Sequence, residues 1–272
     1  MLKKVRIGIA GCGAIGSSLA KAIVKDFSAR ATLSALYDID PVKSSALSRS
    51  LGKNISAKNL GALLKKSDLV IEASQAKSSY DIAYSSLKNG KSILVMSIGG
   101  ILNGFNRLQA LAERKNAKVY LPSGAIAGLD ALKAASLGKI KKVVLTTFKN
   151  PLSFKGNSYL KQKGVKLDKI QNETVLFEGS AKQAVRFFPQ NINVAAALSI
   201  AGIGQERTKV KIVASKKMER NTHEIKIESD SGSITCRTEN VLHPDNPKTS
   251  YLAVLSAVAT LKQIFAPVKI GT

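Results

Sequence analysis

The sequence predicts an α/β protein in which a doubly wound parallel sheet is followed by a second, α+β domain built on a largely antiparallel sheet. Two observations predict this order. Over roughly the first 120 residues, short apolar segments alternate with segments of helical periodicity. After Pro122 this alternation stops, and strand-like segments follow one another with few helices between them.

The first part contains five segments that are typical of buried strands: residues 5–10, 31–37, 68–73, 92–96 and 117–121. Helical periodicity covers residues 14–25, 42–51, 57–65, 78–88 and 106–115. Strands that alternate with helices require crossover connections, which are almost always right-handed and produce a parallel sheet.

The second part is expected to hold strands at residues 142–148, 173–177, 209–214, 222–228 and 233–237. The last two are separated by the hairpin-like loop 229–232. Helices are expected at residues 126–137, at the alanine-rich segment 193–201 and at about 250–264, whereas residues 149–171 show the least pattern.

Composition limits the classes of function. Lys and Arg number 42 against 18 Asp and Glu, for a net charge of +24. Nucleic-acid binding would explain this charge, but a solvated lysine-rich surface is favoured because aromatic residues make up only 5%. Two cysteines and two histidines predict neither a disulfide scaffold nor a metal site. No apolar stretch approaches the ~18 residues that span a bilayer, and a strand-like segment follows Met1 at once, so we expect a soluble, cytoplasmic protein.

A glycine-rich turn joins the first strand to the first helix. Gly11-Cys12-Gly13-Ala14-Ile15-Gly16 has the spacing G-x-G-x-x-G in the strand–turn–helix context that gives this motif its meaning. Gly11 permits the tight turn, Gly13 lets the backbone approach a diphosphate, and Gly16 lets the helix pack on the strand. With the free N–H groups of Ala14 and Ile15 at the helix start, the segment predicts a Rossmann unit that binds a dinucleotide. We therefore expect residues 1–121 to form a dinucleotide-binding domain.

An acidic residue and two loops complete the predicted cofactor site. Asp38 ends the second strand, where a carboxylate accepts hydrogen bonds from the adenosine ribose and repels a 2′-phosphate, so NAD is predicted over NADP. NADP stays open because Lys43 is nearby. Ala73, Ser74 and Ser97 follow the third and fourth strands and either line the nicotinamide ribose or belong to ordinary loops.

Three polar segments precede predicted helices in the second part. They contribute Ser123, Asn193 and the run Lys248-Thr249-Ser250, and each segment is also explained as helix capping. Lys248 is placed in the first turn of the last helix, where a cation opposes the helix dipole. A ligand carboxylate held by Lys248, Thr249 and Ser250 would account for it.

The two histidines are predicted to differ. His223 alternates with Ile225 and Ile227 on one face of a strand, so it is expected to point inward. It is either a general acid/base or a satisfied core histidine. His243 is interpreted as a solvated turn residue.

The chain resembles the L-aspartate dehydrogenase family over nearly its full length. The resemblance rests on the glycine motif, Glu72-Ala73-Ser74, Met96-Ser97-Ile98-Gly99-Gly100, Pro122-Ser123-Gly124-Ala125, Phe188-Pro189-Gln190-Asn191-Ile192-Asn193, Asn221-Thr222-His223 and Asn246-Pro247-Lys248-Thr249-Ser250. It implies that His223 is catalytic, acting with Lys248, and that Ala125 and Asn191 contact the cofactor. It also implies oxidative deamination of L-aspartate to iminoaspartate with reduction of NAD or NADP, a place in NAD biosynthesis, and a homodimer.

The change of pattern after Pro122 predicts that residues 122–247 form the second domain and that a helix within about 248–272 packs back on the first domain. The resemblance implies that this second domain binds the substrate, carries the catalytic residues and forms the dimer. Dihydrodipicolinate reductase shares this plan, but its K-x-D-A-P-S-G segment is absent, because Val119-Tyr120-Leu121 precede Pro122. A regulator that binds NAD without turnover is the alternative from another class.

Overall fold

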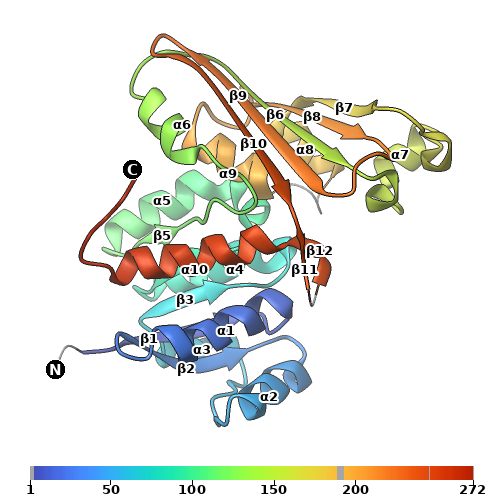
Figure 1. Cartoon of the computed structure of the whole chain (residues 1–272). Coiled ribbons are helices and arrows are strands. Elements are labelled where there is room, and N and C mark those ends of the chain that lie inside the picture. The colour runs from blue at the N-terminus through green and yellow to red at the C-terminus, as the bar shows by residue number, and fades with distance from the viewer. Residues whose placement is uncertain (1–2, 189–192, 245, 272) are drawn as a thin grey trace. The chain divides into compact units, whose positions relative to one another are not determined.

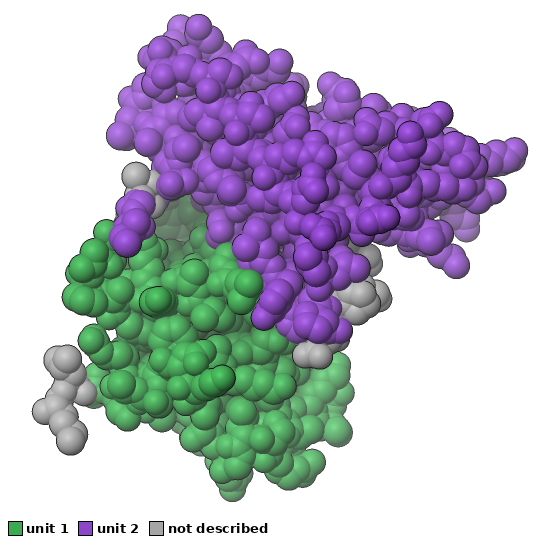
Figure 2. All heavy atoms as spheres, viewed as in Figure 1, with its two compact units in different colours: residues 1–122, 254–269 green, residues 123–253, 270–272 purple. Residues whose placement is uncertain are grey.

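The computed structural model describes residues 3–188, 193–244 and 246–271. The chain divides into two compact units (Figure 2): unit 1 comprises residues 1–122 and 254–269, and unit 2 comprises residues 123–253 and 270–272. Each unit has its own sheet and its own buried hydrophobic cluster. Unit 1 is discontinuous in sequence because most of the last helix, α10 (Tyr251–Phe265), belongs to it.

Unit 1 is built on a five-stranded sheet whose strands are all parallel, which confirms the sequence prediction (Figure 1). The strands are β1 (Val5–Ala10), β2 (Ala31–Tyr37), β3 (Leu69–Glu72), β4 (Ser92–Val95) and β5 (Val119–Tyr120). Their order is β2-β1-β3-β4-β5. Strand β2 lies on one side of β1, and β3, the next strand in sequence, lies on the other side of β1. Open parallel sheets bind ligands at such a reversal of order, outside the carboxyl ends of the strands.

The helices of unit 1 follow the predicted pattern with shifted ends. They are α1 (Ala14–Asp26), α2 (Pro41–Ser50), α3 (Leu60–Lys65), α4 (Ala76–Lys88), α5 (Phe105–Arg114) and the short 3₁₀ helices η1 (Ile98–Gly100) and η2 (Leu102–Gly104). Helix α3 starts three residues later than expected, because Ser56 is still extended beside Leu36 and the Asn59 side chain caps the helix by accepting from the N–H of Ala62.

The core of unit 1 contains segments from both ends of the chain. Ile7 of β1 and Leu19 and Ile23 of α1 have no exposed surface. Ala257 and Leu261 of α10 are buried in the same cluster. Apolar burial is the main stabilising contribution to such a unit, so α10 is part of its core.

Unit 2 is built on a second five-stranded sheet, in the order β10-β9-β6-β8-β7. Its strands are β6 (Ile140–Lys149), β7 (Thr174–Ser180), β8 (Lys209–Ala214), β9 (Asn221–Ser229) and β10 (Gly232–Asn240). Only the β6–β8 pair is parallel among these neighbours, and the other three pairs are antiparallel. The expectation of a largely antiparallel sheet is therefore confirmed. Most strands extend beyond their predicted ends because cross-strand pairing continues, as in the unbroken register of β9 with β10.

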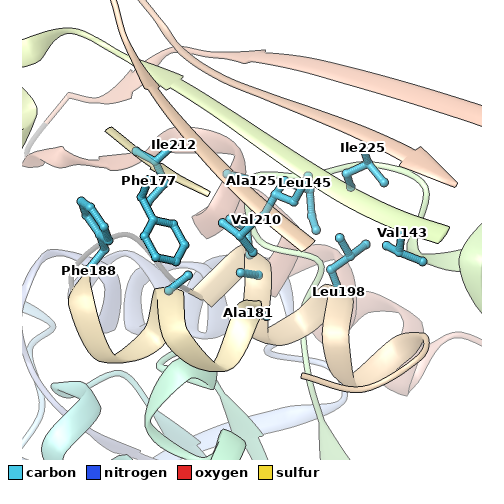
Figure 3. Close-up of a cluster of buried hydrophobic side chains, with 14 of the residues drawn as sticks. Ala125, Val143, Leu145, Phe177, Ala181, Phe188, Leu198, Val210, Ile212 and Ile225 are labelled. Carbon is cyan, nitrogen blue, oxygen red and sulfur yellow. The ribbon is translucent and has the colours of Figure 1, made fainter. Parts of the chain in front are cut away.

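One face of this sheet packs against two helices, α8 (Ala181–Phe187) and α9 (Asn193–Ala201), the second with the predicted bounds (Figure 3). Leu145 of β6 and Ile225 of β9 point from the sheet toward the helices, and Leu198 of α9 meets them. Side chains two residues apart share a face of a strand, so Ile225 and Ile227 define the buried face of β9.

Two segments of unit 2 differ from the predicted helices. Helix α6 (Leu129–Ala135) is shorter than the predicted 126–137, because Gly124 and Gly128 have positive φ angles of 69° and 84°, which a right-handed helix does not allow. Residues 150–171 form the 3₁₀ helices η3 (Pro151–Phe154) and η4 (Leu167–Lys169) with α7 (Ser158–Gln162) between them. The side chains of Asn150 and Asn157 cap η3 and α7.

The prediction for residues 246–250 is wrong. These residues form strand β12 (Asn246–Ser250), which pairs antiparallel with β11 (Leu242–His243), and α10 begins only at Tyr251. The Tyr251 N–H donates to the carbonyl of Val241 at 2.9 Å, so pairing between segments overrides the local capping pattern. Lys248 therefore does not lie in a first helical turn, and its charge does not oppose the dipole of α10 at that position.

Candidate functional site

The glycine turn of unit 1 is shaped by the absence of side chains. Gly11 has φ +104°, and a Cβ there would collide with the carbonyl oxygen of Ala73. A Cβ on Gly16 would collide with the carbonyl oxygen of Gly11, whereas the space around Gly13 is open to at least 4 Å. Gly13 is exposed at the N-terminal end of α1, and Ala14 and Ile15 in the first turn are half-buried. The segment therefore has the closely packed base, open tip and free helical N–H groups that a diphosphate requires, and its residues fit a dinucleotide.

Asp38 lies against this turn. Its Oδ2 accepts a hydrogen bond from the N–H of Cys12 at 2.7 Å, and its Oδ1 accepts one from the N–H of Asp40 at 3.0 Å. The carboxylate at the end of β2 is thus held beside the tip of the glycine turn, at the position that the sequence predicts for a contact with the adenosine ribose.

The thiol of Cys12, in the middle of the turn, is unsuited to covalent chemistry. Burial, together with the negative charge of Asp38, raises its pKa to about 12. The reactive form of cysteine is the thiolate, so Cys12 stays protonated and inert at neutral pH.

The part of the chain that the structure describes holds no cluster of three or more His, Cys, Asp or Glu side chains that could ligate a metal ion. None of its helices combines the length and the apolar character needed to span a bilayer.

The loops after β3 and β4 lie side by side at the same edge of the sheet. The Ser97 hydroxyl donates to the carbonyl of Ser74 at 2.9 Å, and Ala73 donates its N–H to Ala10 at the end of β1. The structure thus brings together the predicted residues of unit 1, from the glycine turn through Asp38 to these loops. It adds Glu72, which belongs to one of the segments that resemble the family but for which no role was predicted: its side chain is fully buried and accepts hydrogen bonds from both serines. The signal was an acidic residue at the end of an otherwise apolar strand.

In unit 2, His223 lies on the buried face of β9 with only 5% of its surface exposed. Its Nδ1 is 3.0 Å from the hydroxyl of Thr147, which stands opposite on β6. Burial, and secondarily the positive charge of Lys149, lowers the pKa of His223 to about 3. The imidazole is therefore neutral at physiological pH, and Nδ1 is occupied while Nε2 remains for another partner.

Lys149, at the end of β6, was also missed from the sequence. It is partly buried, and desolvation of its ammonium group lowers its pKa to about 8. Its positive charge opposes protonation of the imidazole of His223. Its signal was weak, because a single lysine at the end of a strand is common in a chain with 42 Lys and Arg.

Thr238 of β10 connects His223 to the loop that contains Ala125. It pairs with His223 in the sheet, and its hydroxyl donates to the carbonyl of Ala125 at 2.8 Å. The amide of Asn240 donates to the same carbonyl at 3.0 Å. Ala125 is thus fixed by two side chains from the strand beside the histidine, and Ser123, two residues earlier, is half-buried.

The remaining predicted site residues differ in how far they are buried, and two of them are not described. Asn193 is exposed at the start of α9, Thr249 is half-buried and Ser250 is buried at the end of β12. Asn191 and the side chain of Lys248 lie outside the described residues. The interpretation of His243 as a solvated turn residue is wrong: it is 5% exposed, and its ring packs edge-on against Tyr251 at 5.4 Å between centroids.

Comparison with known proteins identifies the relatives of the chain. Residues 130–264 match the family model of the aspartate dehydrogenase C-terminal domain, and residues 11–122 match the NAD-binding domain of homoserine dehydrogenase. The chain is 44% identical to an L-aspartate dehydrogenase of Methanosarcina barkeri over 98% of its own length and 100% of the relative. It is 45% identical to an L-aspartate dehydrogenase of Methanococcoides burtonii with the same coverage.

Solved structures show the same relationship. The aspartate dehydrogenase of Thermotoga maritima superposes with a TM-score of 0.75 at 26% identity, covering 99% of this chain and 100% of the other. A homoserine dehydrogenase of Thiobacillus denitrificans has a TM-score of 0.64 at 15% identity, covering 96% of this chain and 73% of the other, which shows a shared fold alone. The full-length identity, together with the glycine turn and the buried His223, shows that this chain belongs to the L-aspartate dehydrogenase family of NAD(P)-dependent oxidoreductases.

Proposed function

We propose that the protein catalyses the oxidative deamination of L-aspartate, with NAD as the preferred oxidant. L-aspartate, NAD⁺ and water would yield oxaloacetate, ammonium, NADH and a proton, by way of iminoaspartate. The observation that carries the proposal is the neutral, buried imidazole of His223, within the residues that match the aspartate dehydrogenase C-terminal model. Full-length relatives named L-aspartate dehydrogenase support the choice of substrate.

The residues of unit 1 would hold the cofactor. Gly11, Gly13 and the first turn of α1 would bind the diphosphate, Asp38 the adenosine ribose, and the loops with Ser74 and Ser97 the nicotinamide ribose. When bound, the nicotinamide ring supplies the acceptor for the hydride that leaves Cα of the substrate. In unit 2, Ala125 and Asn191 are proposed as further cofactor contacts.

His223 is the proposed proton acceptor. The α-ammonium group of aspartate must lose a proton before its nitrogen can donate electrons to Cα as the hydride departs. The pKa of His223 is about 3 in the protein without ligands, so the imidazole would become a base for this proton when the two substrate carboxylates lie beside it and raise its pKa. The contact between Nδ1 and Thr147 leaves Nε2 for the task. The positive charge that develops on the ring would be balanced by the two substrate carboxylates, for which we propose Lys248, Thr249, Ser250, Ser123 and Asn193 as ligands.

The preference for NAD is supported by the surroundings of Asp38. Its carboxylate is fixed by two backbone N–H groups and would repel a 2′-phosphate. Lys43, the cation that could offset this repulsion, lies 4.0 Å from the carboxylate of Asp40. Lys43 is thus already paired with the carboxylate of Asp40, which weakens its attraction for a 2′-phosphate.

We also propose a cellular location, an oligomeric state and a metabolic role for the protein. The resemblance of the chain to its family supports a cytoplasmic homodimer that supplies iminoaspartate to pyridine nucleotide synthesis. The sheet of unit 2 is the proposed dimer surface, because α8 and α9 pack on one of its faces and the other carries partly exposed side chains such as Phe148 beneath Arg237.

The test is a substrate screen that follows absorbance of the reduced nicotinamide with L-aspartate, D-aspartate, L-glutamate and L-alanine. We expect turnover with L-aspartate and NAD, and a fall of ~10²-fold or more for His223→Asn with little change in NAD affinity. Binding of NAD without reduction by any amino acid would favour the regulator. Unchanged turnover in His223→Asn would remove the histidine from the mechanism.

A further inference from the structure

Glu72 is a buried acid for which the reaction has no direct use. It is the last residue of β3, and its side chain has no exposed surface. The preceding residues of the strand, Leu69, Val70 and Ile71, are buried and apolar. Burying a carboxylate among apolar neighbours is costly unless it is fully hydrogen-bonded, and a well-packed apolar residue often serves stability as well.

The carboxylate joins the two loops at the carboxyl ends of β3 and β4. Oε1 accepts from the N–H of Ser74 at 2.8 Å and from its hydroxyl at 2.7 Å. Oε2 accepts from the N–H of Ser97 at 2.9 Å and lies 3.3 Å from the hydroxyl of Ser79. Each oxygen therefore fixes the backbone of a different loop, and the direct bond from Ser97 to Ser74 closes the connection.

The same segment supports the glycine turn. Gly11 packs so closely on the peptide between Ala73 and Ser74 that a Cβ would overlap it. The turn also has a support of its own, because the N–H of Gly11 donates to the carbonyl of Tyr37 at 2.8 Å. A shift of the Ser74 loop away from Gly11 therefore leaves the turn held at Tyr37, and its effect falls mainly on the loops of Ser74 and Ser97. Asp38 is held by other partners, the N–H groups of Cys12 and Asp40.

We propose that Glu72 is a positioning residue of the cofactor site: its carboxylate holds the loops of Ser74 and Ser97 in the one arrangement that binds the nicotinamide ribose half of NAD. The inference rests on the proposed function, because it assumes that NAD occupies these loops. It assigns Glu72 no contact with substrate or cofactor.

The test compares NAD with ADP, which carries the adenosine and diphosphate groups without the nicotinamide half. In Glu72→Gln, the amide group presents N–H donors to at least one of the two serine N–H groups, so one loop loses its acceptor. We expect the dissociation constant of NAD, measured by calorimetry, to rise about 10- to 100-fold, while that of ADP changes less than twofold. If Glu72 merely stabilised the sheet, Glu72→Gln would change the dissociation constants of NAD and ADP by the same factor.

Control variants separate the outcomes. Glu113→Gln makes the same chemical change on the exposed face of α5 in unit 1 and should leave both affinities unchanged. If Glu72→Gln does not fold, Ser79→Ala removes a buried hydroxyl that lies 3.3 Å from Oε2 and donates to the carbonyl of Ser97 at 3.0 Å. Because Ser79 has no proposed contact with the cofactor, this variant should give a smaller loss of affinity, again larger for NAD than for ADP. Equal effects on NAD and ADP, or no effect on either, would overturn the inference. Wild-type protein that failed to bind NAD would instead overturn the proposed function.

Discussion

The buried, neutral His223 makes the folded protein sensitive to acid. Its pKa is about 3 in the folded state against a usual value of 6.5. Below pH 6.5 His223 becomes protonated in the unfolded chain but stays neutral in the folded chain. The contribution of this site to stability is therefore present above pH 6.5 and is lost as the pH falls toward 3. Replacement of His223 by Asn removes the titration, and the shorter amide can still reach Thr147 from the position of Nδ1.

The size of the effect follows from these two pKa values. Each pH unit between them is worth about 1.4 kcal/mol. When the pH falls from 7 to 5, the free energy of unfolding of the wild type should therefore decrease by about 2 kcal/mol more than that of His223→Asn. Urea unfolding followed by far-ultraviolet circular dichroism suits a chain with no tryptophan. Both proteins are compared at one concentration, so that self-association contributes equally. Parallel pH dependences of the two proteins would refute the reasoning, because the imidazole would then titrate normally in the folded state.

Three further predictions address unit 1. Asp38→Ala should raise the KM for NAD about tenfold and lower that for NADP, because the charge beside the ribose is lost; an unchanged ratio of the two KM values would place the ribose elsewhere. Gly11→Ala should destabilise the protein by about 1–3 kcal/mol, since its φ of +104° and the contact with Ala73 both exclude a Cβ, and a melting temperature equal to that of wild type would contradict this. Cys12 should resist iodoacetamide at pH 8 until urea unfolds the chain, because burial keeps its thiol protonated; mass spectrometry that found it alkylated in the folded protein would show that the turn opens.

Local patterns predicted most of unit 1 because its strands are connected through helices close in sequence. The glycine spacing at Gly11 and the acid at Asp38 lie at positions that the strand–turn–helix context determines, and the structure places both at one edge of the sheet. The inward face of His223 was predictable for the same reason, since alternation along one strand is local information.

The errors arose where contacts between distant segments decide the structure. Residues 246–250 carry the proline and hydroxyl groups of a helix start, but pairing with Leu242 and His243 makes them a strand. Glu72 and Lys149 were missed because no local pattern shows how deeply a charged side chain will be buried. Their importance depends on Ser97 and His223, which approach them only in the folded chain.

The membership of α10 in the core of unit 1 has a consequence for synthesis on the ribosome. The surfaces of Leu19 and Ile23 share a cluster with Ala257 and Leu261, which are translated almost last. While the chain is being synthesised, the amino-terminal part of unit 1 therefore exposes part of its apolar surface until α10 has left the exit tunnel of the ribosome. Premature termination before residue 254 should yield a product that aggregates or needs a chaperone, even though every residue of the nucleotide-binding sheet has been made.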